Sequence, residues 1–146
     1  MRIFSVAKNI IIDTCFWIAL YDKEDEYHEI ANILSEEIEI HNWLVPWPTL
    51  YETLNTRFVR RKNWITLFNF HLAKDFVYKI DDNTYRDAAY NSVFQINFMS
   101  RNNLSLVDLV IHEMLRDVNL KIDAILTFNE RDFFEVCNIK NIEILN

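Results

Sequence analysis

The stretch from Asn9 to Leu20, NIIIDTCFWIAL, constrains the fold of this chain more than any other. Its three consecutive isoleucines are typical of a strand that is covered on both faces of a sheet. Asp13 ends this apolar run, and the residues after it resume an apolar pattern at helical spacing. We therefore predict a buried strand, an acidic residue at its carboxyl end, and then a helix.

Asp13 has two interpretations that this stretch does not separate. In open α/β sheets the carboxyl ends of the strands border the ligand crevice, which makes Asp13 a candidate site residue. Aspartate is also a preferred helix N-cap, so the following helix can account for Asp13 by structure alone. The rest of the chain has to decide between the two.

The chain contains no glycine, and this absence bears on whole classes of function. Phosphate-binding loops of the GxxxxGK[ST] and GxGxxG types need backbone conformations that only glycine adopts freely, so the sequence argues against nucleotide binding by these motifs. The net charge of −7 argues against broad, nonspecific affinity for nucleic acid. It still allows a local basic surface beside a concentrated acidic site.

We expect residues 1–146 to form a single domain around one hydrophobic core. No apolar run approaches the roughly 20 residues of a membrane span, and the first nine residues lack the pattern of a secretory signal. Two cysteines without disulfide or zinc spacing predict reduced thiols. We therefore expect a cytoplasmic protein that does not enter a membrane.

Apolar patterns and turn residues predict strands that alternate with helices along the chain. Strands are expected at residues 9–12, 38–45, 76–80, 123–128 and 142–145, the last at an edge, and helices from residue 14 and at 26–37, 49–60, 64–71, 85–98 and 106–115. This alternation favours a three-layer α/β/α sandwich with a mostly parallel central sheet and right-handed crossovers.

Two further acids lie near predicted helix starts. Asp108 and Ser105 match a capping box, in which each side chain accepts a hydrogen bond from the backbone of the other residue. Glu52 is predicted in the first turn of the helix 49–60, where the helix dipole favours an anion. Each acid therefore has a sufficient structural explanation on its own. Together with Asp13 they occupy positions that border one crevice in such a sheet.

Four short motifs occur in order along the chain: IIIDTCFWIAL, PTLYETLN, SLVDLVIHEML and AILTFNERDFFEV. Together they resemble the motifs of PIN-domain ribonucleases, in particular the VapC-like toxins of toxin–antitoxin pairs. The resemblance extends from Ile10 to about Val136, which is nearly the whole chain. Any one motif is weak, but four in the correct order and at similar separations carry considerably more weight.

The resemblance implies site residues position by position. Asp13 matches the acid that ends the first strand, and Thr14 matches the hydroxyl residue that usually follows it. Glu52 matches the glutamate of the middle helix, and Asp108 matches the acid that opens the late helix. These three acids are therefore the implied catalytic and metal-binding residues.

The fourth motif is where this sequence departs from the family. Thr127 is in place as a supporting hydroxyl, but Asn129 stands at a position that the family shares between Asp and Asn. The charge then has to come from Asp132, or the site uses three carboxylates and a neutral ligand. The number of metal ions, one or two, depends on which alternative holds.

A cluster of carboxylates has a physical requirement of its own. Several anions at one place repel each other unless a cation neutralises them, and hard oxygen ligands suit Mg²⁺ or Mn²⁺. Such an ion can bind a scissile phosphate, acidify a bound water and stabilise the departing oxygen. The resemblance implies RNA hydrolysis that leaves a 5′-phosphate and a 3′-hydroxyl.

A dense basic run follows Glu52. Its members are Arg57, Arg60, Arg61 and Lys62. We favour a role in holding the RNA backbone, with Trp64 close enough to offer a stacking face. The alternative is a solvated helix end whose cations suit the carboxyl-terminal end of the helix dipole.

The sequence thus predicts a metal-dependent endoribonuclease that acts on an RNA substrate. The resemblance further implies a toxin that a protein antitoxin neutralises, and a homodimer. The alternative is a PIN-like module without catalysis that binds RNA or docks on a protein. Asn129 and the acidic net charge are the features that favour this alternative.

Overall fold

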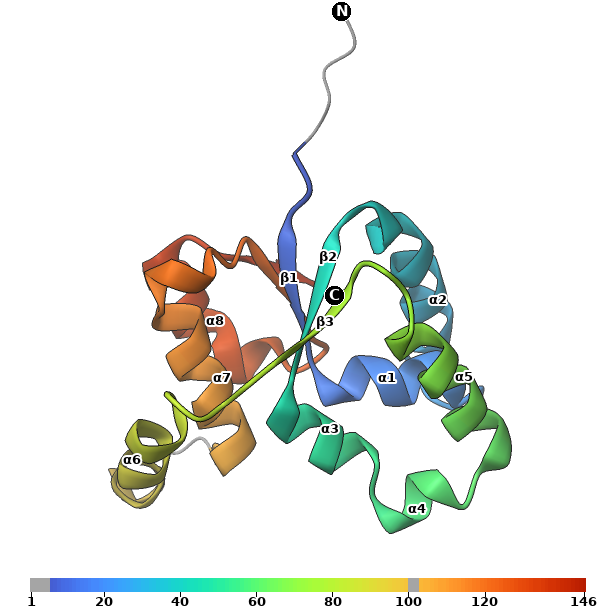
Figure 1. Ribbon diagram of the computed structural model, residues 1–146. Coiled ribbons are helices and arrows are strands. Elements are labelled where there is room, and N and C mark those ends of the chain that lie inside the picture. Colours follow the sequence, from blue (N-terminus) through green and yellow to red (C-terminus); the bar gives the residue numbers. More distant parts are fainter. Residues whose placement is uncertain (1–5, 100–102) are drawn as a thin grey trace, which may run out of the picture.

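The computed structural model describes residues 6–99 and 103–146 and forms a five-stranded sheet between two layers of helices (Figure 1). The strands are β1 (Asn9–Ile12), β2 (Asn42–Pro46), β3 (Val77–Ile80), β4 (Ala124–Leu126) and β5 (Glu143–Leu145). Their order is β3-β2-β1-β4-β5, and every neighbouring pair is parallel. The predicted α/β/α sandwich is confirmed, with a sheet that is parallel throughout and β5 at one edge.

Helices connect the strands. They are α1 (Thr14–Tyr21), α2 (His28–Glu37), α3 (Trp47–Thr53), α4 (Thr56–Val59), α5 (Lys62–Leu72), α6 (Arg86–Met99), α7 (Leu106–Arg116) and α8 (Glu130–Lys140). Short 3₁₀ turns occupy Ile38–Ile40 and Val118–Leu120. In the part of the chain that the structure describes, none of these helices is long and apolar enough to cross a membrane.

The isoleucine run of β1 supplies both faces of the sheet. Ile10 and Ile12 are fully buried in the cluster that α1, α2 and α5 cover, together with Trp17. Ile11 points to the opposite face and packs with Leu109 of α7 and other residues of α6, α7 and α8. Figure 1 shows these two groups of helices on opposite sides of the strands. A continuous apolar run is needed because neither face of β1 meets solvent.

The prediction of one helix over residues 49–60 is wrong. The helix α3 begins two residues earlier, at Trp47, and ends at Thr53. A separate short helix, α4, then starts behind Asn55, whose side-chain oxygen accepts a hydrogen bond of 3.0 Å from the Phe58 backbone N–H. Glu52 therefore lies in the last turn of α3, so the predicted favourable interaction with a helix amino terminus does not apply to it.

Three smaller differences concern residues 26–45 and the end of the chain. The second strand starts only at Asn42, because residues 38–40 form a 3₁₀ turn. In α2 the buried residues are Ala31 and Leu34, whereas the apolar residues Ile30 and Ile33 of the same helix are exposed. The helix α8 was not predicted at all, although its buried residues Phe133, Val136 and Cys137 are at helical spacing.

Candidate active site

The carboxyl end of β1 lies at the point where the strand order reverses. From β1 the chain adds β2 and β3 on one side, and later adds β4 and β5 on the other. Open α/β sheets have their ligand crevice at such a switch point. Asp13 follows β1 directly, and its backbone N–H donates to Leu126 of β4 over 3.1 Å. This edge of the sheet is therefore the first place to look for a site.

The Asp13 carboxylate is buried and held by donors from two elements. Its Oδ1 accepts a hydrogen bond of 2.8 Å from the Thr14 backbone N–H, which is the N-cap contact of α1. Its Oδ2 accepts a hydrogen bond of 2.8 Å from the hydroxyl of Thr127, just after β4. Only 4% of Asp13 is exposed. The N-cap interpretation is confirmed, and it leaves the second oxygen directed to the neighbouring strand end.

Cys15 joins the same network from α1. Its thiol lies 3.4 Å from Oδ2 of Asp13, to which it donates, and it accepts the Phe128 backbone N–H over 3.3 Å. Burial and the negative charge of Asp13 raise the pKa of Cys15 to about 12, which keeps the thiol protonated as a donor. The sequence predicted only that this thiol is reduced. The contact with Phe128 joins segments far apart in sequence, so no local pattern pointed to it.

Asp108 opens α7 in the predicted capping box. Its Oδ2 accepts the Ser105 backbone N–H over 2.9 Å, and the Ser105 hydroxyl accepts the Asp108 backbone N–H over 3.1 Å. The predicted capping box is confirmed. The side chain remains half-buried, so its charge acts on the surroundings.

Electrostatics connects three of the predicted acids. Burial, together with a smaller effect of the Asp108 charge, raises the pKa of Asp13 to about 6, although the hydrogen bonds from Thr127 and Thr14 oppose the shift. Burial and the charge of Asp108 also raise the pKa of Asp132. The structure therefore brings Asp13, Asp108 and Asp132 into one local field, although they come from three different elements.

His112 fixes α7 against α8 beside these acids. Its Nε2–H donates to the backbone carbonyl oxygen of Asp132 over 2.7 Å, and its ring lies edge-on to Phe133 with centroids 5.4 Å apart. Burial lowers the pKa of His112, which favours the neutral ring. Sequence analysis assigned no functional role to this histidine. Its spacing of four residues from Asp108, which puts both on one face of α7, was the available signal.

Asn129 and Asp132 have different surroundings. Asn129 precedes α8, and its backbone N–H donates to the Thr127 hydroxyl over 3.0 Å. Its side chain is exposed and lines a hollow together with Cys15. Asp132 is half-buried in the first turn of α8. Of the two side chains, the charge of Asp108 acts on that of Asp132.

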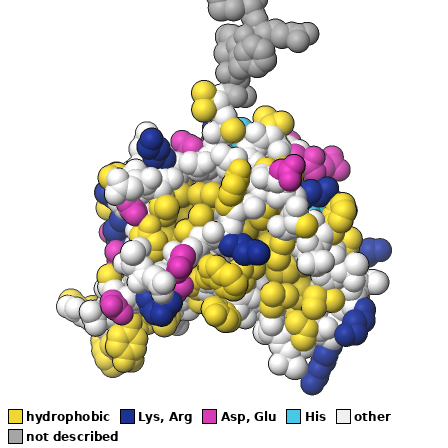
Figure 2. All heavy atoms as spheres, viewed as in Figure 1, with side chains coloured by type: hydrophobic (Ala, Val, Ile, Leu, Met, Phe, Trp, Pro, Cys, Tyr) yellow, Lys and Arg dark blue, Asp and Glu magenta, His cyan; other side chains and the backbone are white. Residues whose placement is uncertain are grey.

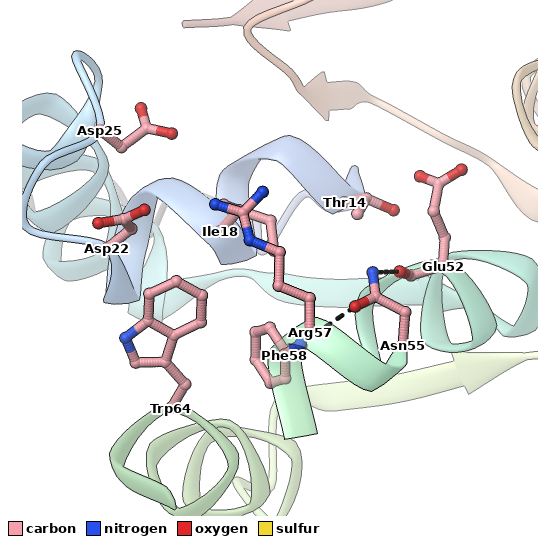
Figure 3. Close-up of a pocket in the computed structure, with 9 residues that line it drawn as sticks. All are labelled: Thr14, Ile18, Asp22, Asp25, Glu52, Asn55, Arg57, Phe58 and Trp64. Atoms are coloured by element: carbon pink, nitrogen blue, oxygen red, sulfur yellow. Dashed lines mark hydrogen bonds between the residues drawn. The ribbon is translucent and has the colours of Figure 1, made fainter. Parts of the chain in front are cut away.

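Glu52 lies on α3, which packs against both α1 and α7. Its exposed side chain and Thr14 line one end of a cavity of about 360 Å³, and Figure 3 shows both at that end. Through Thr14, the cavity reaches the residue next to Asp13. The structure thus gives Glu52 a position on the wall opposite α1.

The donor set can be compared with what a divalent cation needs. Among residues 6–99 and 103–146, no three His, Cys, Asp or Glu side chains lie close enough to hold a metal ion by themselves. Mg²⁺ usually retains several waters and is bound by one or two carboxylates plus substrate phosphate. The Thr14 hydroxyl beside Asp13 is buried and has no hydrogen-bond partner within the described residues. A water on a bound cation would satisfy it, so the residues fit a hydrated ion.

The predicted basic run forms the corner between α4 and α5. Arg57 lines the same cavity as Glu52, and the Arg61 guanidinium lies 4.1 Å from the centroid of the Trp64 ring. Arg60 and Lys62 are exposed at the turn between the two helices. Figure 2 shows Lys and Arg side chains over this corner, at the lower right.

Comparison with known proteins is informative at the level of structure. No family model matches the sequence, and no curated protein is detectably similar to it. Among solved structures, the chain is similar to Mycobacterium tuberculosis VapC20, a Sarcin-Ricin loop cleaving toxin. The match covers 86% of this chain and 94% of VapC20, with a TM-score of 0.68 and 19% sequence identity. The chain has a VapC-like PIN fold.

This VapC-like PIN fold agrees with the resemblance inferred from the four sequence motifs. The motif around Asp13 spans β1 and α1, and the motif around Asp108 begins α7. The motif that contains Asp132 starts in β4 and continues into α8. The resemblance is therefore confirmed as a fold, by a structure with which this chain shares little sequence.

Proposed function

We propose that this protein is a metal-dependent endoribonuclease that hydrolyses RNA phosphodiesters. One observation carries the proposal: the buried Asp13 carboxylate lies at the switch point of a VapC-like sheet, where Thr127 of the neighbouring strand end holds it. The charge of Asp108 acts on both Asp13 and Asp132. Mutually repelling carboxylates destabilise a protein unless a cation is bound among them. Glu52 on the opposite wall is the fourth acid of the proposed site.

The chain's residues have distinct roles in this proposal. Asp13 and Asp108 would hold Mg²⁺ or Mn²⁺, with Glu52, Asp132 and the neutral Asn129 around it. A bound ion would supply Lewis-acid chemistry at the scissile phosphate, at the attacking water and at the departing 3′ oxygen. Thr127 and Thr14 fix the two oxygens of Asp13, so that little reorganisation is needed when the ion enters.

The substrate would meet the basic corner on its way to the acids. Arg57, Arg60, Arg61 and Lys62 offer phosphate contacts that partly offset the repulsion of the acidic crevice. The stack of Arg61 on Trp64 holds one of these cations in place. We assign this surface to the RNA backbone.

Cleavage of RNA by the purified protein tests the proposal. VapC20 is a Sarcin-Ricin loop cleaving toxin, so an RNA oligonucleotide containing this loop is the first substrate, followed by total RNA. We expect cleavage with Mg²⁺ or Mn²⁺ and none with EDTA. Asp13→Asn and Asp108→Asn should each slow cleavage by more than about 100-fold, beyond the usual cost of losing an outer-shell partner.

The control is Asp75→Asn, which makes the same change on an exposed residue just before β3. Asp75 therefore lies at the amino ends of the strands, whereas the proposed site lies at their carboxyl ends. This variant should cleave like the wild type. Asparagine keeps an oxygen for the caps at residues 13 and 108, so the variants should still fold. If the folded wild type cleaves neither RNA with either ion, the function becomes that of a module without catalysis that binds RNA or docks on a protein.

We extend the proposal to control by a protein antitoxin, as in the pairs to which VapC-like toxins belong. A small open reading frame that overlaps the gene upstream would encode this partner. Co-expression should yield a complex that cleaves RNA more slowly than the free protein. Equal cleavage by the free protein and the complex would contradict this extension.

A further inference from the structure

The cavity that begins at Thr14 and Glu52 extends well beyond the acidic site. It lies between α1 on one side and the segment from α3 to α5 on the other, and its volume is about 360 Å³. This volume falls within the roughly 300–1,000 Å³ of small-molecule pockets. Figure 3 shows its far end under Asp22 and Asp25, and the near end at Thr14 and Glu52. The cavity therefore has room for a ligand group that reaches away from the reacting phosphate.

Two carboxylates at the far end are rigid and partly unsatisfied. Oδ1 of Asp22 accepts the Glu24 backbone N–H over 3.0 Å, and Oδ1 of Asp25 accepts the Tyr27 backbone N–H over 2.9 Å. Neither Oδ2 accepts a hydrogen bond from a described residue, and both residues are only half-exposed. The loop after α1 thus presents fixed acceptors to the cavity, without donors of its own to meet them.

The remaining walls suit a flat group that carries a phosphate. Ile18, Phe58 and Trp64 line the cavity from three different helices, and Trp64, at 9% exposed, is the more accessible of the two aromatic side chains. The Arg57 side chain extends into the cavity between these walls and the acids (Figure 3). Arg57 has no ion pair with any residue in the described ranges, so its charge is available to a ligand anion.

Among the RNA bases, guanine fits this combination. Its Watson–Crick edge carries two adjacent donors, N1–H and the 2-amino group, which suit two carboxylate oxygens, here the free Oδ2 of Asp22 and that of Asp25. Adenine and cytosine have a ring nitrogen acceptor beside their amino group, and uracil has carbonyl oxygens on both sides of its N–H. A carboxylate repels each of these acceptors. Protein sites commonly read single-stranded RNA by such edge contacts together with aromatic surface.

We propose that this cavity is a guanine pocket, in which Asp22 and Asp25 accept from the base and Arg57 binds the phosphate of the same nucleotide. Because Glu52 and Thr14 form its near end, the guanosine is the one next to the scissile phosphate. This placement on the substrate rests on the proposed ribonuclease function. The binding of guanine itself does not.

Nucleotide binding in EDTA tests the pocket without cleavage. The indole N–H resonance of Trp64, assigned by Trp64→Phe, reports binding of guanosine 5′-monophosphate by NMR. We expect binding about tenfold tighter than that of the adenosine, cytidine or uridine monophosphate, as for one bidentate base contact. Inosine monophosphate lacks the 2-amino group and should also bind about tenfold more weakly, because one acceptor then has no partner.

Matched variants locate the contact. Asp22→Asn and Asp25→Asn keep the turn acceptor but replace the free oxygen by an amide donor, and together they should weaken guanosine monophosphate binding by about tenfold or more. Glu24→Gln makes the same charge change in the same loop but outside this cavity, and it should leave binding unchanged. Equal binding of all four nucleotides, or no effect of the Asp22 and Asp25 variants, overturns the proposal.

Two outcomes separate this inference from the proposed function. If the protein cleaves RNA without preference for guanine beside the cut and does not bind guanosine monophosphate, the guanine pocket is contradicted and the ribonuclease function is supported. If the protein binds guanosine monophosphate selectively but does not cleave RNA, the guanine pocket is supported and the ribonuclease function is contradicted. Tighter binding of arginine methyl ester than of guanosine monophosphate would assign the cavity to a protein side chain and overturn the proposal.

Discussion

Under the proposed function Asp13 has two roles, as a helix N-cap and as a metal ligand, and the two make different demands on its side chain. As an N-cap it needs only an oxygen for the Thr14 backbone N–H. As an ionised carboxylate it is costly, because burial and the charge of Asp108 raise its pKa to about 6. A cation offsets this cost, so the protein without metal should be the less stable form at neutral pH.

Asp13→Asn should therefore stabilise the metal-free protein, and increasingly so as the pH rises. The pKa of Asp13 lies above its ordinary value of 3.8, so folding favours the protonated carboxyl group. The stability that this preference gives the wild type is fully present below about pH 3.8 and is lost as the pH rises through about 6. By pH 7.5 the difference between variant and wild type should reach about 3 kcal/mol, at about 1.4 kcal/mol for each pKa unit. Urea unfolding in EDTA at pH 4 and pH 7.5 measures it.

The control for this experiment is Asp75→Asn, whose carboxylate is exposed and should make no such difference. Adding Mn²⁺ should reverse the order, because only the wild type retains the carboxylate for the ion. A variant that is no more stable than the wild type at pH 7.5 would show that Asp13 ionises without cost.

The single residues that could be predicted are those with a local signal. Asp13 follows an apolar run and precedes a helix, and Asp108 stands three residues after Ser105, so both caps could be predicted from adjacent positions. The roles of Cys15 and His112 depend on Phe128 and Asp132, which other elements bring near. Spacing along the chain carries no information on such contacts.

At the scale of elements, His112 determines how α7 and α8 present their acids. His112→Ala removes a buried hydrogen bond to Asp132 and the contact with Phe133, so we expect a loss of about 2 kcal/mol or more. Cleavage should slow as well, because Asp132 loses its anchor to the helix of Asp108. Thermal unfolding and single-turnover cleavage measure the two effects.

The matched variant is His112→Gln, whose amide N–H can reach the same carbonyl oxygen. It should recover part of the cleavage rate that His112→Ala loses, while the contact with the Phe133 ring is still missing. Equal rates for the alanine and glutamine variants would mean that packing alone, and not the hydrogen bond, positions α8.

Strands were easier to predict than the breaks between helices. The buried strands β1 and β4 are continuous apolar runs, which fix both their position and their parallel pairing. The break between α3 and α4 was missed because Leu50, Leu54 and Phe58 continue a four-residue period across it. Asn55 was the local signal, since its side chain caps a new helix there.

At the scale of the whole molecule, charge is divided between two regions. The chain has a net charge of −7, but its densest basic run lies over the α4 and α5 corner, beside the proposed site. The guanine pocket and the acids then face an RNA strand that the corner attracts. This arrangement makes local binding of RNA compatible with an acidic protein.

The homodimer that the family resemblance implies would have an available surface on α6. Tyr90, Phe94 and Phe98 follow each other at intervals of four residues, with 57%, 57% and 87% of these side chains exposed. Figure 2 shows hydrophobic side chains gathered over this helix, at the lower left. Contiguous apolar surface of this kind on a folded protein commonly marks an interaction site.

We therefore expect the wild type to be a dimer by light scattering, and Phe94→Glu to be a monomer of unchanged fold. The carboxylate introduced by Phe94→Glu would be buried without a partner in the dimer, whereas it is solvated in the monomer. Gln95→Glu adds a charge to the exposed neighbouring position of α6, beside the aromatic stripe, and should remain dimeric. A monomeric wild type at concentrations of about 100 μM, far above the Kd of a stable dimer, would mean that α6 has another partner.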